Sequence, residues 1–242
     1  MRLKTSLHPA LRNINAVMFD VGGTLVHPDW PRLSDLVQAE TGLPFTTTQM
    51  TEAFYAMLKG VDSELSNAAT KKRSPEPHWT FLETFRSLGI AETSFANIRT
   101  RLSVAHEERH LWCKPDPEAA AVLGHLKRAG LRLAAISNTE DGRVNESLAL
   151  AGLASGLEFL IDSHNVGYRK PDPAIFQLAL DRLELEPKHA AYVGDSFGYD
   201  VIGAQRAGLY PILLDRSAAY AEAGFTRISS LRELFTDKIS SR

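Results

Sequence analysis

The chain has 242 residues, 44% of them apolar, a length that predicts one large domain or a domain with a sizeable insertion. Lys and Arg number 27 and Asp and Glu number 29, so a formal net charge of −2 offers no broad basic surface, and we expect no nucleic-acid partner. No apolar run reaches membrane-spanning length, and the single cysteine, Cys113, cannot form an internal disulfide, so we expect a cytoplasmic protein that does not bind membranes.

The first predicted element is a buried strand over residues 15–20. It is a short apolar run that ends on Asp20, and the sequence Val21-Gly22-Gly23-Thr24 follows at once. A run of this kind before a pair of glycines indicates a strand that enters a tight turn.

Residues 28–113 predict helices and no strand. Apolar residues such as Met50, Phe54 and Met57, and later Phe81 and Phe85, recur at helical spacing. The prolines and charges of 71–77 indicate a loop inside this stretch. We therefore expect a helical insertion at 28–113, between a first core segment at 1–27 and a second at 114–242.

The remaining chain returns to strand and helix patterns. Apolar runs at 131–136, 157–161, 190–193 and 211–214 predict four more buried strands, and 116–129 and 173–183 predict helices between them. Parallel neighbours need crossover connections, so this alternation predicts an α/β fold with a parallel sheet covered by helices on both faces. We expect the residues after Asp237 to be frayed.

Polar residues stand where the predicted strands end. They are Asp20, Ser137-Asn138, and Asp195 with Asp200 five residues later, while Lys170 precedes a predicted helix. Because ligands of parallel α/β sheets collect beyond the carboxyl ends of the strands, we expect these residues to lie together. Each residue alone also fits a structural role, such as a helix cap, but their joint occurrence at strand ends favours a functional site.

These residue types suit a phosphoryl group and Mg²⁺. Asp20 and Asp195 are carboxylates of the kind that hold Mg²⁺, with Asp200 in a supporting role. Ser137 and Lys170 can hold phosphoryl oxygens, and the backbone amides from Val21 to Thr24 can add to the cradle. An aspartate in such a site can attack phosphorus and form an aspartyl-phosphate, which water then cleaves.

Four ordered motifs resemble those of the haloacid dehalogenase-like hydrolase superfamily. They are Asp20-Val21-Gly22-Gly23-Thr24-Leu25, Ser137-Asn138, Lys170-Pro171-Asp172-Pro173 and Gly194-Asp195-Ser196-Phe197-Gly198-Tyr199-Asp200. The resemblance implies a Rossmann-like core, with 28–113 as an all-helical cap. It also implies catalytic Asp20, Ser137 and Lys170, phosphate contacts from Gly23, Thr24 and Asn138, and Mg²⁺ on Asp20, Asp195, Asp200 and the Gly22 carbonyl.

The sequence departs from the family pattern at Gly22. Phosphatases of the family usually carry a second aspartate there, which protonates the leaving group and then activates water. General acid–base help of this kind contributes roughly 10²–10⁴-fold in rate. The candidate replacements are His27, Asp29, Glu140 and Asp141, each of which also fits an exposed loop. We expect that Gly22→Asp raises the hydrolysis of alkyl phosphates.

The interpretation that this sequence favours is a Mg²⁺-dependent phosphohydrolase of a small phosphorylated metabolite with weakened acid–base catalysis. One alternative is a regulatory module that binds phosphate and Mg²⁺ with little turnover. Another is a phosphonate-cleaving hydrolase in which Lys59 forms a Schiff base, although a solvated helical lysine is the simpler interpretation. A dehalogenase is disfavoured, because the dehalogenases of the family that this chain resembles have Ser-Ser-Asn at the fourth motif, where this sequence has Gly194-Asp195-Ser196. Substrate identity and oligomeric state cannot be derived from the sequence.

Two further groups of residues have structural interpretations. Cys113 is predicted to be an inert small residue, because no base accompanies it in the sequence. The remaining histidines, including His78 and His125, are predicted at the surface without metal-ligand spacing.

Overall fold

The computed structural model describes residues 4–66, 76–220 and 224–238, and its centre is a six-stranded sheet. The strands lie in the order β6-β5-β2-β7-β8-β9, and every neighbouring pair is parallel. They are β2 (Ala16–Phe19), β5 (Arg132–Ser137), β6 (Phe159–Asp162), β7 (Ala190–Gly194), β8 (Tyr210–Leu214) and β9 (Arg227–Ile228). Five of them confirm the predicted strands. β9 was not predicted, because its two residues are too few to show an apolar run or an alternation.

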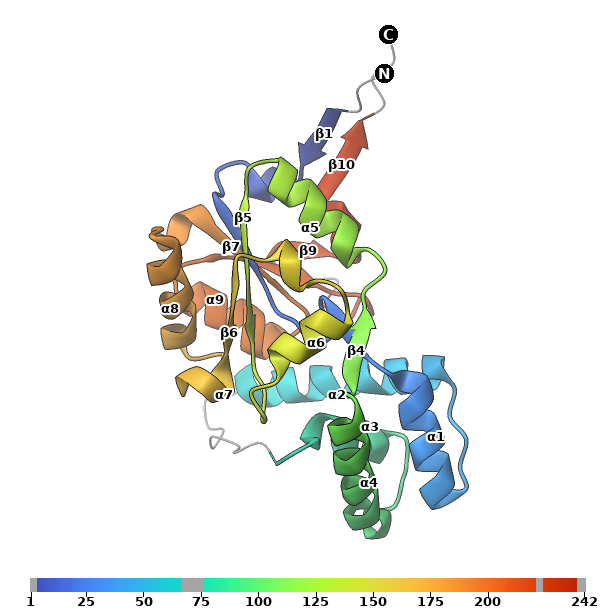
Figure 1. The fold of residues 1–242 in the computed structure, drawn as a ribbon. Coiled ribbons are helices and arrows are strands. Elements are labelled where there is room, and N and C mark those ends of the chain that lie inside the picture. Colours follow the sequence, from blue (N-terminus) through green and yellow to red (C-terminus); the bar gives the residue numbers. More distant parts are fainter. Residues whose placement is uncertain (1–3, 67–75, 221–223, 239–242) are drawn as a thin grey trace.

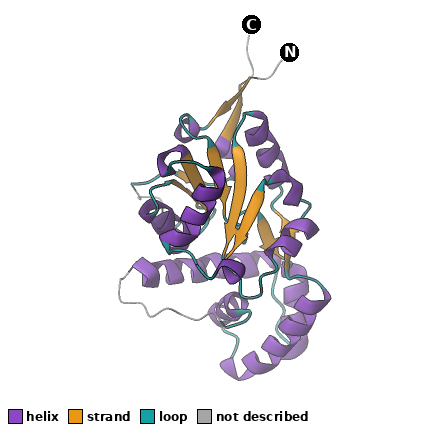
Figure 2. Ribbon diagram, turned by 60° about the vertical axis from the view of Figure 1, so that its left-hand side comes forward, coloured by secondary structure: helices purple, strands orange, loops and turns teal. Residues whose placement is uncertain are grey.

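Helices cover both faces of this sheet, as the alternation of strands and helices predicts (Figures 1 and 2). Val17 and Phe19 of β2 pack in one apolar cluster with α5 (Ala119–Arg128) and α6 (Val144–Leu150). Ala16 and Met18 face the opposite way and pack with α8 (Pro173–Leu183) and α9 (Ile202–Arg206). The side chains of one strand alternate between two buried layers, which explains why the run is apolar throughout.

The insertion between the first and second sheet strands is mainly helical. It contains α1 (Trp30–Thr41), α2 (Thr47–Ser66), α3 (Trp79–Ser87) and α4 (Phe95–Glu108), which pack around their own apolar core (Figure 1). The prediction of no strand in 28–113 is wrong at its two ends. There β3 (Val26–Pro28) pairs antiparallel with β4 (Trp112–Pro115), too short a pair to show a pattern in sequence. Most of the predicted loop at 71–77 lies outside the described residues.

The two ends of the described chain lie side by side (Figure 1). β1 (Lys4–Leu7) pairs antiparallel with β10 (Phe235–Lys238). The prediction that the residues after Asp237 are frayed is therefore wrong for Lys238, whose backbone pairs with Lys4. Residues 239–242 lie outside the described residues. In the described part of the chain, no helix combines the length and apolar character needed to cross a membrane.

Short turns complete the fold. The helix α7 (Ser163–Val166) follows β6, and Phe197–Val201 forms a π-helical turn, η5, after β7. The 3-10 turns are η1 (Pro9–Leu11), η2 (Glu92–Ser94), η3 (Ala154–Gly156), η4 (Pro187–His189) and η6 (Leu231–Leu234).

Candidate active site

The candidate site lies where the direction of the strand order reverses. β2 is the first sheet strand in the chain and β7 the fourth, and they are neighbours in the middle of the sheet. Asp20 and Asp195 each follow the last residue of one of these strands, and the Asp20 amide donates to the carbonyl of Val193 at 2.8 Å. In open α/β sheets, ligands bind in the crevice at this switch point.

Three buried carboxylates converge here. Oxygens of Asp20, Asp195 and Asp200 all lie within 4.8 Å of one another. Burial raises the pKa of Asp20 to about 6, and burial together with the charges of Asp20 and Asp200 raises the pKa of Asp195 well above its ordinary value. So close a group of carboxylates is costly without compensating positive charge.

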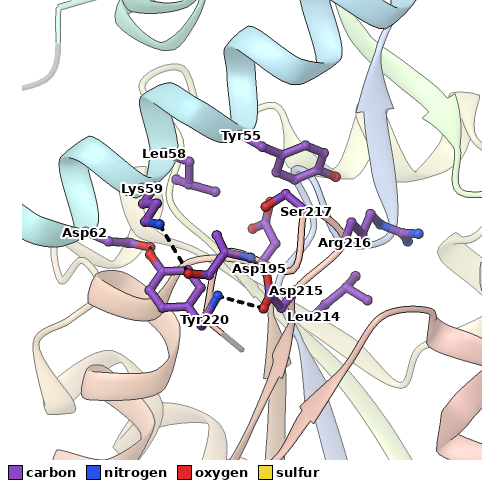
Figure 3. Close-up of a pocket in the computed structure, with 11 residues that line it drawn as sticks. Tyr55, Leu58, Lys59, Asp62, Asp195, Leu214, Asp215, Arg216, Ser217 and Tyr220 are labelled. Atoms are coloured by element: carbon purple, nitrogen blue, oxygen red, sulfur yellow. Dashed lines mark hydrogen bonds between the residues drawn. The ribbon is translucent and has the colours of Figure 1, made fainter. Parts of the chain in front are cut away.

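The environment of Asp195 supplies a test of whether a metal ion fits. Its Oδ2 atom is buried and has no hydrogen-bond partner among the described residues. Asp195 also lines a small pocket of about 10 Å³, shown in Figure 3, which is about the room that one water molecule needs. An orphaned carboxylate oxygen inside a group of three carboxylates fits a small, hard cation such as Mg²⁺.

Lys170 provides positive charge inside this group. Its Nζ atom donates to Asp20 Oδ1 and to Asp200 Oδ1, at 2.6 Å each, and to the hydroxyl of Tyr192 at 2.9 Å. Burial lowers the pKa of Lys170, but the charges of Asp20 and Asp200 outweigh this effect and hold the pKa above its ordinary value. Lys170 therefore remains an ammonium ion, and all three of its donors are used.

Asn138 holds Lys170 through the backbone. Its side-chain amide donates to the Lys170 carbonyl at 3.0 Å, and its carbonyl oxygen accepts from the Lys170 amide at 2.9 Å. The structure thus gives Asn138 a positioning role, and its predicted contact with phosphate stays a prediction. Ser137 is the last residue of β5 and is buried on the sheet edge that carries Asp20.

In the turn after Asp20, the carboxylate of Asp195 occupies the space that a side chain at Gly23 would need. Gly23 has a φ of 86°, and a Cβ atom there would lie 2.0 Å from Asp195 Oδ2. The amides of Gly23 and Thr24 donate to the carbonyls of Val26 and Val21 inside the turn. These two amides, predicted to cradle phosphate, are therefore used by the turn itself in this structure.

An aromatic ring fills the space next to Gly22. A Cβ atom at Gly22 would lie 3.3 Å from Cζ3 of Trp112, which stands on β4. The Trp112 ring stacks on Phe81, with the ring centroids 5.5 Å apart, and meets Phe54 edge-on at 5.9 Å. The Trp112 ring thus lies against Gly22 on one side and packs against the core of the helical insertion on the other.

The four candidate replacements for that aspartate all have partners elsewhere. The contacts are His27 Nε2 with Asp116 at 3.1 Å, Asp29 with Lys114 at 3.0 Å, Glu140 with Trp79 at 3.2 Å and Asp141 with His106 at 2.7 Å. In the group of three carboxylates around Lys170, none of the four takes part. Cys113 is buried, and this burial raises the pKa of its thiol. A raised thiol pKa lowers the fraction of reactive thiolate, which is consistent with the predicted inert residue.

One site residue that the sequence did not indicate comes from the insertion. Asp62 on α2 is buried and accepts from the backbone amides of Phe197 and Gly198 at 2.8 Å each. It also accepts from the hydroxyls of Ser196 at 2.5 Å and Tyr220 at 2.6 Å. Asp62 therefore connects α2 to the loop directly after Asp195; a single aspartate in an amphipathic helix carries no signal of this in sequence.

A wide cleft adjoins the small pocket. It has a volume of about 1060 Å³ and shares five lining residues with the small pocket, namely Tyr55, Lys59, Arg216, Ser217 and Ala219. Lys59 lies on the wall of both, and its Nζ atom donates to the carbonyl of Ala219 at 3.2 Å. The cleft is large enough to admit a small metabolite next to the small pocket that Asp195 lines.

The prediction for the remaining histidines is wrong for two of them. His106 and His110 are only 8% and 5% exposed, and together with Asp141 they form a second group of possible metal ligands. The signal was present in the sequence, because His106 and His110 are four residues apart, as in the zinc-binding pattern His-Glu-x-x-His.

Comparisons with known proteins agree on one family. Residues 14–208 match the haloacid dehalogenase-like hydrolases. The phosphoserine phosphatase of Thermus thermophilus is 38% identical over 122 residues, which is 49% of each chain. The glyceraldehyde 3-phosphate phosphatase of Methanothermobacter thermautotrophicus is 28% identical over 94% of this chain and 97% of its own.

Solved structures show the same fold. The magnesium-bound hydrolase YfnB of Bacillus subtilis superposes with a TM-score of 0.66 at 19% identity, over 91% of this chain and 96% of its own. Haloacid dehalogenases also stand among the similar sequences and structures.

Proposed function

The chain belongs to the haloacid dehalogenase-like hydrolase family, and within it we propose that the protein is a Mg²⁺-dependent phosphohydrolase of a small phosphorylated metabolite. The observation that carries this proposal is the group of Asp20, Asp195 and Asp200 around Lys170, at the carboxyl ends of β2 and β7. The two phosphatase relatives are consistent with it.

We assign the metal ion to Asp20, Asp195, Asp200 and the backbone carbonyl of Gly22. The buried Oδ2 atom of Asp195 has no hydrogen-bond partner among the described residues, so a bound cation would satisfy it. When bound, Mg²⁺ would neutralise phosphoryl charge and orient the substrate.

Asp20 is the proposed nucleophile. Its raised pKa of about 6 leaves it ionised at neutral pH, and Lys170 orients it from 2.6 Å. A carboxylate oxygen of Asp20 forms a bond to phosphorus while the ester P–O bond breaks and the leaving oxygen departs with the electron pair. Water then cleaves the aspartyl-phosphate, which releases inorganic phosphate and restores Asp20. Ser137 would hold a phosphoryl oxygen through this sequence, and Lys170 would do so by exchanging one of its three present hydrogen bonds for the phosphoryl group.

The leaving oxygen must find a proton without help from position 22. Gly22 has no acidic side chain, and the Trp112 ring beside it cannot donate a proton to oxygen. We therefore expect esters with acidic leaving groups, such as aryl phosphates, to react faster than alkyl phosphates. Weakened acid–base catalysis is the part of the proposal that depends on this position.

The insertion supplies the proposed substrate selection. We propose that 28–113 is a cap over a core made of 1–27 and 114–242, and that side chains of the wide cleft recognise the part of the substrate beyond its phosphate. The lining of this cleft carries one more cation than carboxylates, which favours an anionic substrate: the charged residues are Lys59, Lys114, Arg216, Glu52 and Asp116.

A phosphate-release screen tests the proposal. A panel of phosphorylated metabolites is incubated with the protein, with and without Mg²⁺, and Asp20→Asn serves as the isosteric control. We expect release that requires Mg²⁺ and disappears in Asp20→Asn. Release by Asp20→Asn at the wild-type rate would contradict the role of Asp20, and halide release from a 2-halo acid in its place would identify a dehalogenase.

The same position supports a second candidate function, a phosphate- and Mg²⁺-binding regulatory module with little turnover. The observation that favours it is the Trp112 ring against Gly22. Calorimetry with the metabolite panel separates the two candidates, because tight binding without product favours the module. Phosphonate cleavage through Lys59 is a third candidate, and an unaltered rate in Lys59→Ala dismisses it.

A further inference from the structure

A second group of metal-ligand side chains lies between the insertion and the sheet, apart from the carboxylates around Lys170. It contains His106 from the last turn of α4, His110 from the segment just after this helix and Asp141 from the loop after β5, with ligand atoms within 4.8 Å of one another. We propose that these three residues bind a transition-metal ion such as Zn²⁺ and that the ion joins the insertion to the sheet. This proposal is independent of the proposed hydrolytic activity.

The histidines come together through a sharp end of α4. The helix ends at Glu108, and Arg109 is extended, with φ −163° and ψ 130°. His110 therefore does not continue the helical face but folds back beside His106, with the two ring centroids 4.4 Å apart. Both rings are buried and both Nε2 atoms face Oδ2 of Asp141.

The spacing of the three ligand atoms suits a zinc ion. His106 Nε2 lies 2.7 Å and His110 Nε2 lies 4.0 Å from Asp141 Oδ2. Ligand atoms at roughly 2.0–2.1 Å from a tetrahedral zinc stand about 3.3 Å from each other, so zinc binding requires His106 Nε2 to move away from Asp141 Oδ2 and His110 Nε2 to approach it. Imidazole and carboxylate are also ligands that zinc accepts, and the partial exposure of Asp141 leaves a fourth position open to water.

The surroundings orient two of the three ligands. His110 Nδ1 lies 2.9 Å from the Trp112 carbonyl, to which it can donate, and 3.1 Å from the Trp112 amide, from which it can accept; metal on Nε2 would select the first of these contacts. Asp141 Oδ1 accepts from the Arg143 amide at 3.1 Å, which leaves Oδ2 for the ion. His106 Nδ1 accepts a long contact of 3.3 Å from the Leu111 amide, and metal on Nε2 would put a proton on Nδ1 and release this contact.

The chemistry of this site is expected to be structural. In zinc peptidases the glutamate after the first histidine is the general base. Here the Glu107 side chain is 80% exposed and pairs with Arg143 at 3.3 Å, away from the ligand atoms. Asp141 follows Ser137, the last residue of β5, by four residues, so an ion here would hold α4 against the strand end that carries Ser137.

Calorimetric titration of EDTA-treated protein with Zn²⁺ tests the proposal. Saturating Mg²⁺ is present throughout to occupy the carboxylate site, and Asp195→Asn reports any zinc that still binds there. We expect one Zn²⁺ per chain, with affinity reduced by roughly tenfold or more in His106→Gln and in His110→Gln. The exposed histidine His164 supplies the matched control, because His164→Gln should bind zinc as the wild type does.

Nitrogen NMR of the histidine side chains gives a second readout on the unaltered protein. Zinc should displace the proton from Nε2 of both His106 and His110 and shift those resonances. Unchanged resonances at both rings would overturn the proposal. So would zinc binding that survives both histidine substitutions and disappears in Asp195→Asn, because the zinc would then occupy only the carboxylate site.

Discussion

Trp112 sets the outcome of restoring an aspartate at position 22. The sequence predicts that Gly22→Asp raises alkyl phosphate hydrolysis, but a Cβ atom there would lie 3.3 Å from the Trp112 ring. At this distance the ring must shift by a few tenths of an ångström to admit the Cβ atom, and the carboxylate needs further room beyond it. We therefore predict that Gly22→Asp gains activity only when Trp112 is also replaced by a smaller residue, such as leucine.

The magnitudes follow from the packing. Overpacking at a tight site costs about 1–3 kcal/mol, which lowers the Tm of a chain of this size by about 2–12 °C. Trp112→Leu alone also destabilises, because it removes the ring that stacks on Phe81 and meets Phe54 edge-on. In the double variant the aspartate occupies the space that the ring leaves. The loss in free energy of unfolding should therefore be smaller than the sum of the two single-variant losses by about 1–2 kcal/mol.

The assay compares four proteins: the wild type, each single variant and the double variant. kcat/KM is measured for an aryl and an alkyl phosphate, with Tm and Mg²⁺ binding as controls for folding. The alkyl phosphate should gain about 10²-fold or more in the double variant only, with little change for the aryl phosphate. An equal gain in Gly22→Asp alone, without loss of Tm, would refute the role of Trp112. A folded, Mg²⁺-binding double variant without gain would show that the missing acid does not limit the reaction.

Three further predictions concern the same site. Mg²⁺ should raise Tm more at pH 7 than at pH 5. Because the pKa of Asp20 is raised to about 6 in the fold, its protonated form stabilises the metal-free protein fully below about pH 4, and this contribution is lost as the pH rises through 6, where Mg²⁺ binds the ionised carboxylate. A Tm shift by Mg²⁺ that does not depend on pH in thermal scans would contradict this prediction. Asn138→Ala removes two hydrogen bonds to Lys170 and should lower the free energy of unfolding by about 1–3 kcal/mol, measured in urea against the wild type. Gly23→Ala places a Cβ atom 2.0 Å from Asp195 Oδ2 and should weaken Mg²⁺ binding by roughly tenfold or more in calorimetry, and unchanged affinity would show that the turn adapts.

Local patterns determined the strands and the residues at their ends. Each buried strand has apolar side chains on both faces, so its run is readable without knowledge of its neighbours, and Asp20 and Asp195 stand directly after two such runs. The parallel arrangement then brings those two strand ends together, which is why the group of carboxylates follows from the order of the motifs. The pair β3 and β4 was not predictable, because three or four residues that include proline show no alternation.

Only the tertiary structure decided what surrounds these residues. The ring of Trp112 lies against Gly22 across 90 positions of the chain, and Asp62 reaches the amide of Gly198 across 136. Likewise, His106 meets Asp141 at the junction of the insertion and the sheet. Helical periodicity shows which face of a segment is buried, but the angle at which one packed body meets another depends on side-chain shapes from both. The sequence by itself thus determined the fold class and the strand-end residues, and packing between distant segments decided their neighbours.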